Sequence, residues 1–261
     1  MTIMNIKRTI CFVLICMLIT AMTGCGGKKD EYTEPDGAES GEKTLSAEAQ
    51  EIYQYVVPEE GDLCADIFIL DYGHIYVKLF RDDAPYAVEN FVNKANDDEY
   101  DGTLITQAVR DYYLQGGKPI EGSKIKEESI WGGGFSNEIS ERLFPTRGAL
   151  CMANQGVDGT NAMQFFIVAN SPETVQGLEG PIYDRYGMSL LEYLKNNYNT
   201  ELNSEQLERF INYGGAPWIY GHNTVFGQVY KGFDVLDEVI RAAAVGSKEI
   251  YIKKITVYEH V

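Results

Sequence analysis

Amide and aromatic side chains lie close together in the stretch of residues 148–168, at spacings that suit binding rather than nucleophilic chemistry. Asn154 and Gln164 offer neutral hydrogen-bond donors and acceptors at the ends of two predicted strands. Phe165 and Phe166 are neighbours on the second strand, so their side chains point to opposite faces. One of the two rings can therefore enter the core while the other forms the floor of a pocket.

The elements that position these side chains follow from the order of residue types. Residues 149–153 are apolar and predict a buried strand, and residues 164–168 are aromatic and β-branched and predict a second strand. Residues 154–160 are rich in Gly, Asp and Asn and predict a loop. The two strands therefore present a loop between them.

Six short motifs, in the same order along the chain, resemble the signature of the cyclophilins, the cyclosporin-binding peptidyl-prolyl isomerases. Each motif alone is an ordinary turn or strand sequence, but six in order over residues 66–258 make coincidence improbable. The motifs are AP..VENF (84–91), YDGT (100–103), QGG (115–117), MAN (152–154), QFFI (164–167) and TVFGQV..G.DVLD (224–237).

The resemblance implies a mainly β fold, a closed antiparallel barrel capped by two helices. Residues 66–70 and 74–80 are β-rich on either side of a turn, and residues 250–258 alternate as a final strand. The first capping helix is expected after Pro85 and the second around residues 235–240, where apolar residues recur at helical spacing.

The chain divides into three predicted parts: residues 1–24 as a lipoprotein signal peptide, 25–62 as an acidic tether with a short helix, and 63–261 as the barrel domain. Residues 171–217 are much longer than the usual connection of the family, and two apolar helix faces predict an inserted helical hairpin beside the pocket. The hairpin either covers the core or selects a substrate or partner. The two faces are Leu191, Leu194 and Tyr198, and Leu207, Phe210 and Ile211.

The resemblance also implies an apolar slot for a proline ring and a set of groups that hold the peptide on either side. The slot and chain-holding residues that contact substrate are expected to be Tyr112, Met152, Ala153, Gln164, Phe166, Trp218 and Ile219. Gln115, Asn154 and the loop of residues 154–161 are expected to hold the chain through side-chain and backbone hydrogen bonds.

The sequence departs from the family pattern at one position that matters for catalysis. Counting back from the QGG motif places Gln107 where the family has an arginine, which supplies a hydrogen-bond donor toward the proline nitrogen. Arg110 does not replace it, because a separation of three along a strand turns a side chain to the opposite face. Asn223 stands where a histidine is usual. Gln107 is therefore the expected donor.

Twisting an amide needs neither a nucleophile nor a metal, so we expect no cofactor. The histidines His74, His222 and His260 are far apart and lack ligand spacing, and no metal site is predicted. The chain of 261 residues has 22 Lys and Arg against 39 Asp and Glu, a net charge of −17. Such a charge repels phosphate backbones and argues against nucleic-acid binding.

The amino terminus is typical of an export signal. Lys7 and Arg8 precede an apolar run of residues 9–22, which is short for a membrane span, and the run ends in Met-Thr-Gly-Cys25. The tetrapeptide resembles a bacterial lipoprotein processing box, which implies cleavage before Cys25 and lipidation of its thiol. The protein would then lie on the extracytoplasmic side of the cell membrane, anchored only by lipid. An ordinary secretory signal or an uncleaved anchor is the alternative.

Two cysteines, Cys64 and Cys151, remain in the folded part. They could pair in an oxidising compartment, although a small buried hydrophobe is the commoner role for Cys151 in an apolar strand. The pairing is left open.

The expected function is a monomeric peptidyl-prolyl cis-trans isomerase that acts on proline-containing polypeptides, assists the folding of exported proteins and has reduced turnover. The alternative is a proline-peptide binding module or holdase that keeps the slot and has lost most turnover. An unrelated solute-binding lipoprotein is disfavoured, because the folded part is small for two lobes.

Overall fold

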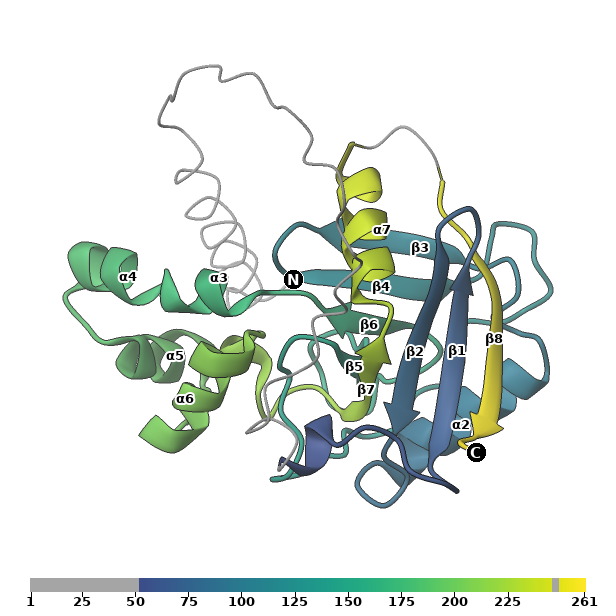
Figure 1. Cartoon of the computed structure of the whole chain (residues 1–261), viewed down its shortest axis with the longest axis horizontal. Helices are drawn as coiled ribbons and strands as arrows, with labels where there is room; N and C mark the ends of the chain where they lie inside the picture. The colour runs from purple at the N-terminus through teal and green to yellow at the C-terminus, as the bar shows by residue number, and fades with distance from the viewer. Residues whose placement is uncertain (1–51, 246–248) are drawn as a thin grey trace, which may run out of the picture.

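The computed structural model describes residues 52–245 and 249–261, and one antiparallel sheet dominates them (Figure 1). Its eight strands have the order β3-β4-β6-β5-β7-β2-β1-β8. The strands are β1 (Leu63–Ile69), β2 (Gly73–Leu79), β3 (Leu104–Val109), β4 (Tyr113–Lys118), β5 (Ala149–Met152), β6 (Phe165–Val168), β7 (Val225–Lys231) and β8 (Ile252–Glu259). The expected mainly β fold is confirmed.

The first hairpin shows how the sequence pattern becomes structure. Ala65, Ile67 and Ile69 alternate along β1 and are buried, while the residues between them face outward. The turn to β2 uses Asp71 at φ 70° and Gly73 at φ 130°, a left-handed backbone that short polar residues and glycine tolerate. The predicted strands of residues 66–70 and 74–80 are confirmed as β1 and β2.

The sheet curls into a half-barrel, and its two edge strands, β3 and β8, meet near the start of each strand. A single antiparallel bridge joins Leu104 at the start of β3 to Tyr251 just before β8. Two backbone hydrogen bonds of 2.9 Å each add to it, from Ile105 N to Ile250 O and from Ile252 N to Thr103 O. Contact between the edges satisfies backbone groups that an open sheet leaves exposed.

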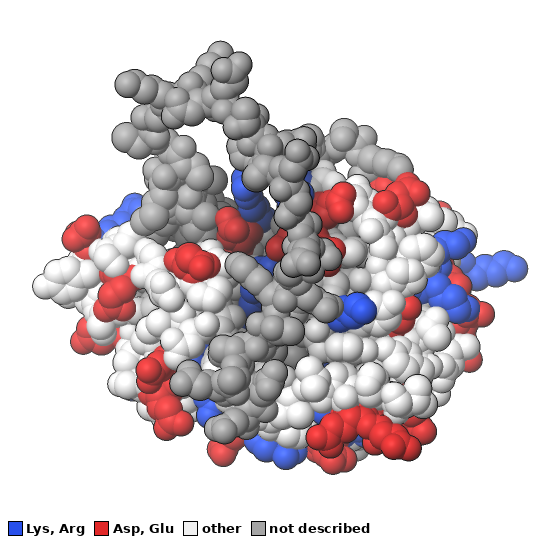
Figure 2. All heavy atoms as spheres, in the orientation of Figure 1, with Lys and Arg blue, Asp and Glu red and all other residues white. Residues whose placement is uncertain are grey.

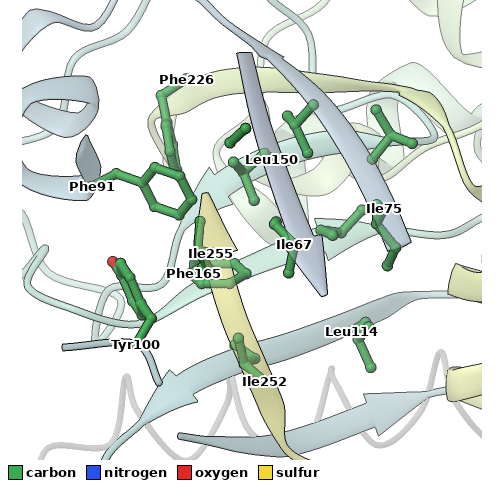
Figure 3. Close-up of a cluster of buried hydrophobic side chains, with 14 of the residues drawn as sticks. Ile67, Ile75, Phe91, Tyr100, Leu114, Leu150, Phe165, Phe226, Ile252 and Ile255 are labelled. Atoms are coloured by element: carbon green, nitrogen blue, oxygen red, sulfur yellow. The ribbon is translucent and has the colours of Figure 1, made fainter. Parts of the chain in front are cut away.

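The main core fills the concave side of the curled sheet, as Figure 3 shows for ten labelled side chains. Helix α2 (Pro85–Asn96) contacts β8 and places Phe91 in this core, against Tyr100, Phe165 and Phe226 at ring-centroid distances of 5.3 to 5.6 Å. Helix α7 (Phe233–Val245) contacts β2, β3 and β4. The two predicted capping helices are therefore present.

The segment of residues 171–217 is helical but richer than the predicted hairpin. It contains four helices, α3 (Pro172–Gln176), α4 (Glu179–Tyr186), α5 (Leu190–Tyr198) and α6 (Ser204–Tyr213), followed by the 3₁₀ turn η3 (Pro217–Ile219). Helices α5 and α6 carry the two predicted apolar faces, and each begins with a capping box, Ser189 with Glu192 and Asn203 with Gln206. Figure 1 shows these helices on the side of the sheet away from β1 and β8.

The described chain begins with a short 3₁₀ turn, η2 (Tyr53–Tyr55), that belongs to the folded body. Gln54 is buried, and its amide donates to Phe144 O at 2.8 Å and to Gln228 Oε1 at 2.9 Å. Its Oε1 accepts from Phe144 N at 2.8 Å. The domain therefore starts before residue 63, the predicted boundary, because this amide bridges two distant segments.

The predicted signal peptide, most of the tether, the start of the short helix and the lipidation residue Cys25 lie outside the described residues. Within residues 52–245 and 249–261, no helix has the length and apolar character required to cross a membrane.

Candidate active site

Three neighbouring strands bring the predicted site residues together. Gln107 on β3 lies opposite Gln115 on β4, and Gln115 lies opposite Phe166 on β6. Residues that are paired across antiparallel strands project from the same face, so these side chains form one row. Tyr113, two residues before Gln115, is on the same face.

Gln107 lies at the exposed end of this row. Its Oε1 accepts a hydrogen bond of 2.5 Å from the hydroxyl of Tyr113, and its Nε2 has no hydrogen-bond partner among the described residues. Arg110 lies in the following turn with its side chain 74% exposed, and its nearest carboxylate is that of Asp111 at 4.0 Å. Arg110 therefore does not enter the site, as the strand periodicity predicts. Tyr113 was not singled out from the sequence, although its two-residue spacing from Gln115 was a usable signal.

The aromatic floor of the site is buried. Tyr112, Phe166, Trp218 and Ile219 are each 8% exposed or less and belong to one apolar cluster. Trp218 Nε1 donates to the hydroxyl of Tyr112 at 2.8 Å, which satisfies two polar atoms that would otherwise be costly to bury. The structure thus brings four of the predicted slot residues together.

Met152 is the predicted slot residue that the structure places elsewhere. It pairs with Phe165, not Phe166, across β5 and β6, and its side chain is 1% exposed in the main core. Cys151, its neighbour, is the β5 residue that lies opposite Phe166. Because side chains alternate along a strand, Met152 packs on the face opposite the slot.

Amide groups form a hydrogen-bonded chain beside the floor. Gln115 Nε2 donates to Gln164 Oε1 at 2.9 Å, and the backbone N–H of Ala153 donates to Gln164 O at 3.0 Å. Gln164 Nε2 in turn donates to the carboxylate of Glu127. The sequence did not indicate Glu127 as a residue of the site. Hydrogen bonds between neutral amides and one carboxylate thus link four residues: Gln115, Ala153, Gln164 and Glu127.

The side chain of Asn154 holds its own loop. Its Nδ2 donates to Asn137 Oδ1 and to His222 O, both at 3.1 Å, and its Oδ1 accepts from Gly156 N at 2.9 Å. In the part of the chain that the structure describes, the backbone groups of Asn154 have no hydrogen-bond partner. The side-chain amide of Asn154 is therefore engaged within its own loop, whereas its backbone groups remain available.

Asn223 lies at the position where the family usually has a histidine. Its Nδ2 donates to Met152 O at 3.1 Å, and this hydrogen bond braces β5.

Among the described residues no three His, Cys, Asp or Glu side chains are grouped as metal ligands. Cys64 and Cys151 form no disulfide and are 0% exposed. Burial raises the pKa of both thiols, that of Cys64 to about 11.

Comparison with known proteins identifies the family. The chain matches the family model "Cyclophilin type peptidyl-prolyl cis-trans isomerase/CLD" over residues 65–196 and 193–259. Curated proteins named "Putative peptidyl-prolyl cis-trans isomerase" are similar to it. One from Staphylococcus aureus (strain COL) is 35% identical and one from Staphylococcus epidermidis is 34% identical, each over 175 residues, 64% of this chain and 76% of the relative.

Solved structures agree on the fold. The crystal structure of a cyclophilin type peptidyl-prolyl cis-trans isomerase from Cryptosporidium parvum superposes with a TM-score of 0.55 at 24% identity, covering 77% of this chain and 99% of that one. A second, determined in the presence of the dipeptide Ala-Pro, gives a TM-score of 0.52, also at 24% identity, over 76% of this chain and 99% of that chain. The chain belongs to the cyclophilin-type family, and its enzyme class is peptidyl-prolyl cis-trans isomerase.

Proposed function

We propose that this protein isomerises prolyl bonds of exported polypeptides at lower turnover than arginine-bearing members of the family. The observation that carries the proposal is the neutral amide of Gln107, with its N–H end free of partners in the described chain, beside the row that leads to Phe166.

The chemistry depends on the twisted amide. Rotation about a peptide bond has a barrier of about 18 to 20 kcal/mol because resonance is lost, and uncatalysed X-Pro exchange takes on the order of tens to hundreds of seconds. The proline nitrogen regains a basic lone pair when the bond twists. A donor that meets this lone pair stabilises the transition state more than either planar form, which is what raises the rate.

The weaker hydrogen bond of a neutral donor determines how much turnover should be lost relative to an arginine donor. Hydrogen bonds that involve a charged group contribute about 1.5 to 3 kcal/mol, roughly twice the contribution of neutral ones. Each 1.36 kcal/mol of lost stabilisation lowers the rate by about tenfold. The difference of about 0.75 to 1.5 kcal/mol corresponds to a loss of about three- to tenfold in turnover. The effect on affinity should be smaller, because the floor and the amide chain remain.

The substrate class and location rest on separate observations. A related fold was determined in the presence of Ala-Pro, which supports proline-containing peptides as ligands. Lys7, Arg8, the apolar run and Cys25 support export and lipid anchoring on the extracytoplasmic side, and we propose a monomer that reaches its clients there.

The test is the exchange rate of an Ala-Pro tetrapeptide, followed by a protease-coupled assay, for the native protein and for Phe166→Ala. Acceleration that is lost with the Phe166 ring supports the proposal. Binding of the same peptide without any acceleration would identify a binding module instead.

A further inference from the structure

We propose that Tyr113 is a positioning residue that holds Gln107 with its N–H end toward the substrate site. This inference rests on the proposed function, because it assigns the way in which a neutral side chain serves at the position of a charged donor.

The contact between the two side chains is direct and local. The Tyr113 hydroxyl donates to Gln107 Oε1 at 2.5 Å. Gln107 lies opposite Gln115, two residues along β4 from Tyr113, so the pair is a diagonal one on a single face of the β3–β4 hairpin. Long side chains reach each other across such a diagonal. The register of β3 shifts between Ile105 and Gln107, so the usual alternation is offset just before Gln107.

The direction of this hydrogen bond decides which end of the amide is available. A glutamine amide has an acceptor end and a donor end, and rotation about its last bond exchanges them. In Gln107 the acceptor end is occupied by Tyr113, and Nε2 has no partner among the described residues. The lone pair of a twisted prolyl nitrogen needs a donor, and a reversed amide would present an oxygen that repels it. In the orientation that the structure shows, the Tyr113 hydroxyl therefore holds the acceptor end of the amide and leaves the donor end for the substrate.

The ring of Tyr113 is itself held by the floor of the site. It meets Tyr112 edge-on at a centroid distance of 4.5 Å and Phe166 edge-on at 5.7 Å. Tyr112 is fixed by the hydrogen bond from Trp218. The orientation of the Gln107 amide is thus tied to the same aromatic cluster that is expected to receive the proline ring.

The competing explanation is that Tyr113 only packs. Its ring contacts would satisfy that role, and Tyr113→Phe keeps them while it removes the hydroxyl. The substitution therefore separates packing from positioning.

The experiment is a double-mutant cycle of Tyr113→Phe and Gln107→Ala, read as kcat and KM in the prolyl exchange assay. Removing one neutral hydrogen bond should lower kcat about three- to tenfold with KM changed less than about twofold. In the Gln107→Ala background the same substitution should change kcat by less than about twofold, because there is no amide to position.

Tyr251→Phe is the matched control, since its hydroxyl also donates at 2.5 Å to a side-chain oxygen, that of Glu249. Tyr251 lies beside the start of β3, opposite Leu104, and is not part of the row formed by Gln107, Gln115 and Phe166. Side-chain amide signals of Gln107 in ¹⁵N-labelled protein should move in Tyr113→Phe and stay in Tyr251→Phe, whatever the activity.

Four outcomes overturn the inference. An equal loss of kcat with and without the Gln107 amide would make Tyr113 structural, and a rise in KM alone would make it a substrate contact. Unmoved Gln107 amide signals would show that the hydroxyl does not hold the amide. A native protein that binds the peptide but never accelerates exchange would overturn the proposed function as well, and only that result would do so.

Discussion

At the scale of residues, the polar side of the site consists mainly of neutral amides. Gln107 and Gln115 lie on the adjacent strands β3 and β4, and Gln164 directly precedes β6 and accepts from Gln115. The Glu127 carboxylate accepts from Gln164. Neutral hydrogen bonds give orientation at modest free energy, which suits a site that must hold and release a peptide chain. In the proposed function, the aromatic floor supplies the apolar part of the binding.

The two free thiols give a prediction at this scale. Burial, followed by the nearby Asp62 carboxylate, raises the pKa of Cys64 to about 11, and burial alone raises that of Cys151. A raised pKa leaves little thiolate at pH 8, so both residues should resist alkylation in the folded protein. Mass-spectrometric mapping of iodoacetamide labelling should show neither residue modified until denaturant is added, when both become reactive.

A disulfide would also block labelling in the folded state, but it would persist in denaturant without reductant. Persistent protection of Cys64 and Cys151 in denaturant would contradict the free, buried thiols of the structure.

Part of the residue assignment could be predicted and part could not. Four predicted site residues lie in family motifs or at fixed sequence distances from them, and the structure brings these four together in one apolar cluster. They are Tyr112, Phe166, Trp218 and Ile219. Met152 lies one residue from the position on β5 that faces Phe166, and only the pairing register shows which of the two neighbours faces the slot. The hydrogen bond between Tyr113 and Gln107 forms just after a register shift on β3, and nothing in the sequence marks that shift.

At the scale of elements, the helical segment of residues 171–217 shares its core with the site. Leu178, Ile182, Leu190 and Leu194 belong to the same apolar cluster as the slot residues. Thr200, just after α5, donates its hydroxyl to Trp218 O at 3.2 Å. The segment therefore supports the floor of the site as well as covering the sheet.

Truncation of one buried residue of α5 should lower both the stability of the fold and the affinity of the site for peptide. Leu194 is 1% exposed, and Leu194→Ala should lower the free energy of unfolding by about 2 to 5 kcal/mol through lost burial and a cavity. Urea unfolding followed by circular dichroism measures the change, and peptide affinity should fall with it.

Lys195→Ala, at the next position with its side chain 64% exposed, is the matched control and should change stability by no more than about 0.5 kcal/mol. Equal effects of the two substitutions would show that α5 does not pack on the core.

Elements with long apolar periodicity were predictable, and short ones were not. Residues 88–95 and the faces of α5 and α6 repeat at helical spacing and gave the right helices. Helices α3 and α4 bury only Val175 and Ile182, respectively, and Gly177, Gly180 and Pro181 interrupt the pattern. Their formation depends on tertiary contact, such as that of α3 with α6, rather than on local periodicity.

At the scale of the whole molecule, the protein is acidic and its charge is spread out. Figure 2 shows carboxylates over both the helical segment and the barrel side of the visible face, with basic groups scattered between them. A net charge of −17 repels anionic lipid headgroups. Attachment to a membrane would therefore depend on the proposed lipid at Cys25 and not on the charge of the protein.

Cys25→Ala tests the anchor. Without the thiol no lipid can be attached, so the protein should either leave the membrane fraction or be misprocessed, and its mass should change in both cases. Fractionation of bacterial cells and intact-mass spectrometry measure both effects. Cys64→Ala, at a buried thiol of the folded domain, is the control for removing a cysteine and should leave the protein in the membrane fraction. Unchanged membrane retention and unchanged mass of Cys25→Ala would contradict the proposed anchoring.

The central claim is that the neutral donor at Gln107 limits turnover, and the catalysed exchange rate of Gln107→Arg against the native protein tests it most directly. Restoring a charged donor should raise the rate about three- to tenfold at equal enzyme concentration, with little change in peptide affinity. The same substitution combined with Phe166→Ala should show no gain, because the floor is lost. A native rate already equal to that of an arginine-bearing cyclophilin, or a Gln107→Arg protein that folds and binds peptide but is no faster, would contradict the account.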